Sequence, residues 1–209
     1  MKFELPTIYP ITDKKLAHQT THLAILKELI RGGARLVQVR DKETPVAELL
    51  SDLRGCVDFA HDKKVTLLVN DRCDLVLSCH AMGVHLGQED IPPAAARAIL
   101  EKNQVIGFST HSIAQVREAC NMPVQYIGFG PVYGTSTKAN ASPTVGLRRL
   151  RAACKVSTVP VVAIGGIGLD QIKPVLDAGA ASAAVISSLM TAENLARQME
   201  RFLRKAKER

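Results

Sequence analysis

Residues 35–70 read RLVQVRDKETPVAELLSDLRGCVDFAHDKKVTLLVN, and their pattern indicates the architecture of the whole chain. The apolar runs at 35–40 and 66–70 are too short for helices of ordinary length and contain β-branched residues, which is typical of strands. Between them, residues 45–63 are amphipathic and open with Pro45, a residue favoured in the first turn of a helix. A strand, a helix and a second strand in this order predict parallel strands.

The same alternation continues along the chain. Further short apolar runs predict strands at 7–12, 83–87, 105–109, 126–130, 161–166 and 183–188. Most of the intervening segments are amphipathic and helical in spacing, and the one between the third and fourth strands, RCDLVLSCHA (72–81), is the weakest. Gly32 and Gly33 are typical of a helix end, and Ser112 of a helix start. Eight such units predict an α/β fold, a closed (β/α)8 TIM barrel that forms a single domain over residues 1–209.

The main alternative fold is a doubly wound open sheet. A G-x-G-x-x-G fingerprint after the first strand would favour that sheet, but residues 7–15, TIYPITDKK, contain no glycine. No long linker or low-complexity segment interrupts the repeat, so we expect no second domain. The barrel is therefore the preferred interpretation.

Composition limits the classes of partner. Hydrophobic residues make up 46% of the chain and aromatic residues 4%, with no Trp, so the core is expected to be aliphatic. The formal charge is +7, and many basic residues lie late in the chain, in LRRLR (147–151) and RFLRKAKER (201–209). Solvated helix faces explain such runs, and no basic run alternates with aromatic residues as a nucleic-acid platform requires. We expect no nucleic-acid partner, although a non-catalytic nucleic-acid-binding barrel remains the alternative that the charge motivates.

Five cysteines without a CxxC pair argue against a disulfide framework and against a structural zinc site. The first ten residues lack the apolar centre of a signal peptide, and no run approaches the roughly 18 apolar residues of a membrane span. We therefore expect a cytoplasmic protein with no membrane partner.

Polar residues gather where the predicted strands end, which is where barrels of this class place their active sites. They are Gln38, Arg40, Asp41 and Lys42 after the second strand, Asn70 and Asp71 after the third, Asp90 after the fourth, Ser109 after the fifth, and Thr135, Thr137 and Lys138 after the sixth.

Their charges indicate a ligand. Arg40, Lys42 and Lys138 are cations suited to phosphate, and Asp71 and Asp90 are hard oxygen ligands suited to Mg²⁺ shared with a phosphate. Together they predict a pocket for a diphosphate and magnesium. Taken singly, Arg40 could form a surface pair with Asp41, and Asp71 and Asp90 could cap the helices that follow them.

The seventh and eighth strands end differently. AIGGIG (163–168) and AVISS (184–188) expose backbone N–H groups in the loops that commonly bind phosphate in this barrel class. The other interpretation is a tight glycine turn without a ligand. We thus expect two anion sites, one made of side chains and metal and the other of backbone amides.

Other catalytic arrangements fit less well. No G-x-S-x-G elbow supports a serine nucleophile, and no cysteine stands beside an obvious base. His85 lies within an apolar strand, which indicates a core or supporting histidine, although His85 and His111 could also act as bases. Two carboxylates could form a glycosidase pair, but the surrounding cations fit phosphate better.

These motifs resemble the thiamine phosphate synthase family. The resemblance covers nearly the whole chain in order and rests on YPITD, QVRDK, LLVNDRCDL, GVHLGQED, GFSTHS, YIGFGPVYGTSTK, VVAIGGIG and AAVISS. It implies a TIM barrel that joins a hydroxymethylpyrimidine diphosphate to a thiazole phosphate and releases pyrophosphate. The implied reaction is a Mg²⁺-assisted dissociative displacement, in which the leaving diphosphate must be stabilised and no protein nucleophile is needed.

The resemblance also implies residue roles. Gln38 holds the pyrimidine, Asp71 and Asp90 bind Mg²⁺, and Thr135 and Thr137 lie between the two substrates. The diphosphate contacts Arg40, Lys42, Asn70, Ser109 and Lys138, of which Arg40, Lys42, Ser109 and Lys138 are the expected catalytic residues. The thiazole phosphate contacts Gly166, Ile186 and Ser187. Residues 134–146 are expected to form a lid over bound substrate, and a homodimer is possible because the family often forms dimers.

The nearest rival is a thiazole tautomerase, which resembles the synthase in fold. That relative carries an acid–base histidine just after the sixth strand, where this chain has Pro131. Pro131 and the full set of cations and aspartates favour the synthase.

Overall fold

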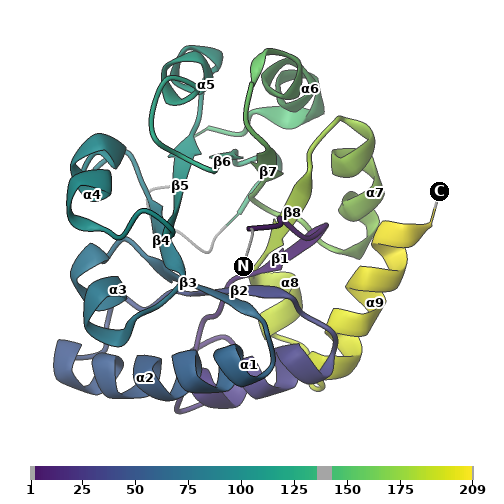
Figure 1. The fold of residues 1–209 in the computed structure, drawn as a ribbon. Coiled ribbons are helices and arrows are strands. Elements are labelled where there is room, and N and C mark those ends of the chain that lie inside the picture. Colours follow the sequence, from purple (N-terminus) through teal and green to yellow (C-terminus); the bar gives the residue numbers. More distant parts are fainter. Residues whose placement is uncertain (1–2, 136–142, 209) are drawn as a thin grey trace.

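The computed structural model describes residues 3–135 and 143–208. Its strands form an eight-stranded parallel sheet in the order β1-β8-β7-β6-β5-β4-β3-β2, and the helices surround it (Figure 1). The sheet closes between β1 and β2, where Ile11 bridges to Gln38 and the Thr12 N–H donates to the Gln38 carbonyl oxygen at 2.9 Å. The predicted TIM barrel is therefore confirmed.

Short buried runs form the strands. Their bounds are β1 Ile8–Pro10, β2 Leu36–Val39, β3 Thr66–Asn70, β4 Gly83–Leu86, β5 Val105–Thr110, β6 Tyr126–Phe129, β7 Val161–Ala163 and β8 Ser182–Val185. The helices between and after them are α1 His22–Arg31, α2 Val46–Asp62, α3 Cys73–Cys79, α4 Pro93–Ile99, α5 Ile113–Ala119, α6 Gly146–Val156, α7 Leu169–Asp177, α8 Ser187–Met190 and α9 Leu195–Lys207.

Local signals explain several helix ends. The Ser112 hydroxyl accepts a hydrogen bond from the Gln115 N–H at 3.2 Å, so the predicted start of α5 is confirmed. Helix α1 ends at Arg31 with Gly32 as its C-cap, and Gly33 follows with a φ of +93°, the left-handed conformation that glycine adopts without strain. Pro45 lies one residue before α2 rather than in its first turn.

Most predicted strands were longer than the observed ones, and the seventh and eighth ran three residues too far at their C-terminal ends. The seventh ends at Ala163 instead of 166, because Gly165 and Gly166 have φ values of +100° and +62°, which end the extended backbone. The eighth ends at Val185 instead of 188. The Ile186 carbonyl oxygen accepts hydrogen bonds from the N–H groups of Leu189 and Met190, so the chain turns into the short helix α8.

The core has two parts. The larger part lies between the strands and the surrounding helices. The smaller part fills the barrel and contains two of the largest fully buried side chains, Tyr9 and Tyr126. The ring of Phe3, from the N-terminal segment, stacks on Tyr126 with 5.9 Å between ring centroids. Because these side chains fill the barrel interior, the room for a ligand lies at the strand ends.

All five cysteines are free, with Cys56, Cys73 and Cys79 buried. In the part of the chain that the structure describes, no helix combines the length and the apolar character that a membrane crossing requires.

Candidate active site

Three charged side chains converge at the ends of β2, β3 and β4. The Lys42 ammonium lies 3.0 Å from the Asp71 carboxylate, and Asp71 is near enough to Asp90 to raise the pKa of its carboxyl group. Asp90 is also held by the Gly87 N–H, which donates to its Oδ2 at 2.6 Å. The structure thus brings together two predicted metal ligands and one predicted phosphate contact.

Neither carboxylate caps a helix, so that alternative for Asp71 and Asp90 is wrong. The residues that precede α3 and α4 are Arg72 and Pro92, and neither helix has a side-chain cap. Asp71 has a φ of +64°, an uncommon conformation that aspartate tolerates better than most residues. Its N–H donates to the His85 carbonyl oxygen at 2.8 Å, which continues the pairing of β3 with β4 past the end of β3.

The carboxyl pair is short of positive charge. Burial raises the pKa of Asp90, and the neighbouring Asp71 raises this pKa further, while the Gly87 N–H and Lys42 offset only part of the rise. Two neighbouring carboxylates repel each other unless a cation lies between or beside them. This is the electrostatic setting that a divalent cation would stabilise.

Arg40 follows β2, and its Nη1 lies 4.0 Å from the Asp13 carboxylate. Its Nε is buried and makes no hydrogen bond within the described residues. A buried donor without an acceptor is costly, and a bound anion would supply the missing acceptor. The alternative pairing of Arg40 with Asp41 is wrong, because the Asp41 carboxylate faces other partners.

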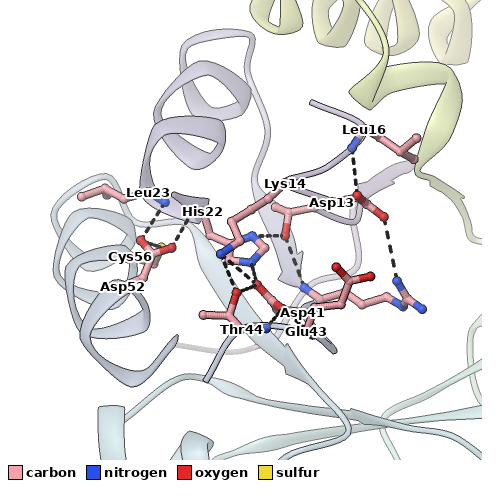
Figure 2. A network of polar contacts seen from close by, with 12 residues as sticks. Asp13, Lys14, Leu16, His22, Leu23, Asp41, Glu43, Thr44, Asp52 and Cys56 are labelled. Atoms are coloured by element: carbon pink, nitrogen blue, oxygen red, sulfur yellow. Dashed lines mark hydrogen bonds and ion pairs between the residues drawn. The ribbon is translucent and has the colours of Figure 1, made fainter. Parts of the chain in front are cut away.

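Asp41 is the centre of a polar network that the sequence did not reveal (Figure 2). Its side chain is only 5% exposed, and its Oδ2 lies 3.1 Å from Lys14 Nζ and 3.0 Å from His22 Nε2. The other ring nitrogen of His22 lies 2.8 Å from the Thr12 hydroxyl. The loops that follow β1 and β2 are therefore joined through the first residue of α1.

The same carboxylate is also held by its own loop. Asp41 accepts hydrogen bonds from the N–H groups of Glu43 and Thr44, each at 2.9 Å, and from the Thr44 hydroxyl at 2.7 Å. Burial alone would raise the pKa of Asp41, but these hydrogen bonds and the one from His22 outweigh it and hold the pKa well below its usual range. The network fixes the backbone between Arg40 and Lys42, the two predicted phosphate contacts of this loop.

Gln38 and Ser109 are buried near the C-terminal ends of β2 and β5. Gln38 is 2% exposed and donates from Nε2 to the Tyr9 hydroxyl at 2.8 Å. The Ser109 hydroxyl lies 2.9 Å from His85 Nε2. His85 thus lies within the barrel and contacts Ser109, a position that fits the expected core or supporting histidine. The part played by the two barrel tyrosines was missed, and a tyrosine in an otherwise apolar strand was the only signal for it.

Backbone groups dominate at the ends of β7 and β8. A Cβ atom added to Gly165 would lie 2.4 Å from the Pro131 Cβ, and one added to Gly166 would lie 2.3 Å from the Gly134 carbonyl oxygen. The close approach lets the β6 and β7 loops pair, with the Val132 N–H donating to the Ile164 carbonyl oxygen at 2.8 Å. Both glycines are therefore required by the backbone path.

The β8 loop is tied to the β7 loop by one side chain. The Ser188 hydroxyl donates to the Ile167 carbonyl oxygen at 2.7 Å. This places Gly166 and the pair Ile186 and Ser187 on neighbouring loops of the barrel. The N–H groups of Gly166 and Ser187 donate no hydrogen bond within the described residues.

The remaining predicted residues lie around the same end. Asn70 is the half-buried last residue of β3, and Thr135 is half-buried in the loop after β6. Thr137 and Lys138, with most of the predicted lid, lie outside the described residues.

The comparisons with known proteins agree with this arrangement. The sequence profile described as thiamine monophosphate synthase matches residues 8–189. The chain is 41% identical to the thiamine-phosphate synthase of Koribacter versatilis over 191 residues, 90% of each chain. It is 38% identical to that of Methanospirillum hungatei over 195 residues, 93% of this chain and 95% of the relative.

A solved structure agrees as well. The thiamine phosphate pyrophosphorylase of Pyrococcus furiosus superposes with a TM-score of 0.87 at 32% identity, covering 96% of this chain and 95% of that one. The profile match spans most of the chain, and both curated relatives exceed the identity at which family membership is secure. The chain therefore belongs to the thiamine monophosphate synthase family, whose members are transferases of thiamine biosynthesis.

Proposed function

We propose that this chain joins 4-amino-2-methyl-5-(diphosphooxymethyl)pyrimidine to 4-methyl-5-(2-phosphooxyethyl)thiazole, giving thiamine phosphate and pyrophosphate. The observation that carries the proposal is the convergence of Lys42, Asp71 and Asp90 at the ends of β2, β3 and β4. It is joined by Arg40, in the same loop as Lys42, whose buried Nε makes no hydrogen bond within the described residues. Cations and a carboxyl pair in one place suit a diphosphate that shares a divalent cation with the protein.

The carboxyl pair fits Mg²⁺. Both ligands are hard oxygens, the pair lacks positive charge, and Mg²⁺ usually takes one or two carboxylates and completes its shell with phosphate and water. No cluster of three or more His, Cys, Asp or Glu side chains suited to a metal occurs in the described part of the chain, so a cage made only of protein is not expected there. When bound, Mg²⁺ would neutralise charge on the leaving diphosphate.

The side chains have separate roles in this proposal. Arg40, Lys42 and Asn70 bind the diphosphate, with Lys138 from the loop after β6, and Ser109 donates a hydrogen bond to it. Beyond its bond to Tyr9, the Gln38 amide has one acceptor and one further donor that make no hydrogen bond within the described residues, the pattern that complements the edge of an aminopyrimidine. Because the leaving diphosphate is stabilised in place, the bond between its oxygen and the methylene carbon on the pyrimidine breaks. The thiazole nitrogen then attacks that carbon in the resulting cation.

The second substrate would occupy the β7 and β8 side. The free N–H groups of Gly166 and Ser187 suit the thiazole phosphate, with Ile186 against its apolar part. Thr135 and Thr137 would lie between the substrates and help to align them. The homodimer stays a prediction.

The test is pyrophosphate release with both substrates and Mg²⁺, with each substrate omitted in turn and with EDTA added. We expect release only when both substrates and the metal are present. Asp71→Asn should abolish most of it, while Asp74→Asn, an exposed carboxylate paired with Arg72, should leave it unchanged. Failure in every mixture, with the thiazole phosphate still bound, would contradict the proposal and favour the tautomerase or a non-catalytic role.

A further inference from the structure

A continuous chain of hydrogen bonds crosses the barrel interior from Gln38 to Ser109. Gln38 Nε2 lies 2.8 Å from the Tyr9 hydroxyl, and that hydroxyl lies 2.7 Å from the Tyr126 hydroxyl. The Tyr126 hydroxyl lies 2.9 Å from His85 Nδ1, and His85 Nε2 lies 2.9 Å from the Ser109 hydroxyl. The two ends are proposed substrate contacts, and the three members between them have no role in the function proposed above.

The middle of the chain is shielded from water. Tyr9 and Tyr126 are 1% and 0% exposed, and His85 is 9% exposed. The His85 ring stacks on the Tyr126 ring, with 5.5 Å between centroids. Burial raises the pKa of both tyrosine hydroxyls, so each stays protonated and brings one proton to the chain. In such surroundings a donor without an acceptor is costly.

Counting protons gives the chain a direction. The Gln38 amide nitrogen can only donate, so the Tyr9 oxygen accepts, and the Tyr9 proton has the Tyr126 oxygen as its acceptor among the described residues. The Tyr126 proton then goes to His85 Nδ1, which must accept. His85 is left with its proton on Nε2, donating to the Ser109 oxygen.

The Ser109 end supports the same direction. If the chain ran the other way, the Ser109 proton would be used on His85, and only lone pairs would face the ligand. An anionic diphosphate would be repelled by such lone pairs, whereas a free hydroxyl proton would bind it. This second argument rests on the proposed function, and the proton count does not.

We propose that Tyr9, Tyr126 and His85 are positioning residues that hold Ser109 as a hydrogen-bond donor toward the diphosphate and hold the Gln38 amide in one orientation. The chain of hydrogen bonds thereby links the Gln38 contact to the pyrimidine ring with the Ser109 contact to the leaving diphosphate. Ser109 and Gln38 touch the substrate in this proposal, and the other three act through them.

The neighbouring strands leave room for these rings. A Cβ atom added to Gly107 in β5 would lie 2.1 Å from the Tyr126 ring and 2.6 Å from His85 Nδ1. One added to Gly128 in β6 would lie 3.4 Å from His85 Cε1. A glycine inside a strand that is otherwise apolar often marks such a close approach, and here Gly107 makes space for the central link.

The first measurement is made on the wild-type protein without substrates. Nitrogen-15 NMR of the imidazole rings distinguishes a protonated ring nitrogen from an unprotonated one. We expect His85 as the neutral tautomer with its proton on Nε2 and with Nδ1 unprotonated. A proton on Nδ1 would overturn the inference, even if the same preparation releases pyrophosphate normally.

The second measurement uses variants in which single atoms are removed. Tyr126→Phe should lower kcat/KM for the pyrimidine diphosphate by about tenfold, through a higher KM, a lower kcat or both. The KM for the thiazole phosphate should change less than twofold. Ser182→Ala is the control, because it removes a fully buried hydroxyl of β8 that has no hydrogen-bond partner among the described residues, and it should leave both constants unchanged.

A double variant separates positioning from general damage. If Tyr126 acts through Ser109, then adding Tyr126→Phe to Ser109→Ala should cause less than a twofold further loss. Losses that multiply would overturn the inference. If Tyr126→Phe does not fold, the double variant is made with Tyr9→Phe and Ser109→Ala instead. Tyr9 is the link before Tyr126 in the chain of hydrogen bonds. Absence of coupling activity in the wild type would count against the proposed function, while the tautomer measurement would still decide the direction of the chain.

Discussion

The two sides of the site are built from different parts of the polypeptide. On the side of β2, β3 and β4, charged side chains converge on one point and a buried network holds the loop that carries them. On the side of β7 and β8, paired loops and left-handed glycines present backbone N–H groups. A substitution on the first side can remove a charged group and leave the backbone in place. On the second side the N–H groups are positioned by the backbone itself, so a substitution that moves the backbone also moves them. We therefore expect substitutions on the two sides to have different consequences.

Gly165→Ala should have the largest effect, and it should be on stability. The new Cβ would overlap Pro131, and the residue would keep a φ of +100°, so we expect the free energy of unfolding to fall by about 3 kcal/mol. Gly146→Ala is the matched control, because Gly146 has a φ of +72° and no atom elsewhere in the described residues lies within 4 Å of the added Cβ. Its loss should be about 1 kcal/mol. Equal losses in urea denaturation would show that the loop contact is unimportant.

Asp90→Asn should separate activity from stability on the opposite side. Removing one of two neighbouring carboxylates should raise the free energy of unfolding in metal-free buffer, because it removes their mutual repulsion. Turnover should fall by about 100-fold, because the cation loses a ligand. Asp74→Asn again serves as the control. A variant that is both less stable and fully active would contradict the assignment of this pair to a bound cation.

Asp41→Asn should weaken the network that holds the β2 loop. An amide in place of Oδ2 would oppose the donors of Lys14 and Thr44, so we expect a loss of about 2 kcal/mol in the free energy of unfolding. Urea denaturation at pH 7 measures it.

The same variant makes a prediction about pH. The pKa of Asp41 is lowered in the folded protein, so its stabilisation is fully present above the unfolded value of about 3.9 and is lost as the pH falls toward the folded pKa. The stability difference between wild type and Asp41→Asn should therefore shrink below about pH 4. A difference that stays constant from pH 7 to pH 3 would show that the carboxylate charge is not what matters.

Ser188→Ala should have the smallest effect on stability, about 1 kcal/mol, because it removes one hydrogen bond to the Ile167 carbonyl oxygen. Thermal unfolding of the variant provides the measurement. No change at all would indicate that the β7 and β8 loops are held together by packing alone.

Much of this architecture was accessible from the sequence because strand ends and helix ends leave local signals. The alternation of apolar runs predicted the barrel, and the charged residues after β2, β3 and β4 predicted the group that converges there. The ends of β7 and β8 were misplaced, because the apolar residues Ile164 and Ile186 follow these strands and resemble strand residues. The chain leaves the extended conformation at Gly165 and Gly166 after β7, and it turns into α8 after Ile186.

The buried networks were not accessible in the same way. Tyr9 and Tyr126 lie 117 residues apart, and only closure of the barrel brings their hydroxyls together. The sequence suggested that Asp41 pairs with its neighbour Arg40. In the structure, Asp41 instead pairs with His22, the first residue of α1, and with Lys14, in the loop after β1. Contacts of this kind depend on tertiary geometry and leave no periodic pattern.

The most direct test of the division between the two sides is to measure the KM values for both substrates in Lys42→Ala and in Ser188→Ala. Lys42 is more than half exposed, and its ammonium pairs with Asp71, so its removal should act on ligand binding more than on folding. We predict that Lys42→Ala raises the KM for the pyrimidine diphosphate at least about tenfold and that Ser188→Ala raises only the KM for the thiazole phosphate. Equal changes in both KM values for either variant would contradict the assignment of one substrate to each side.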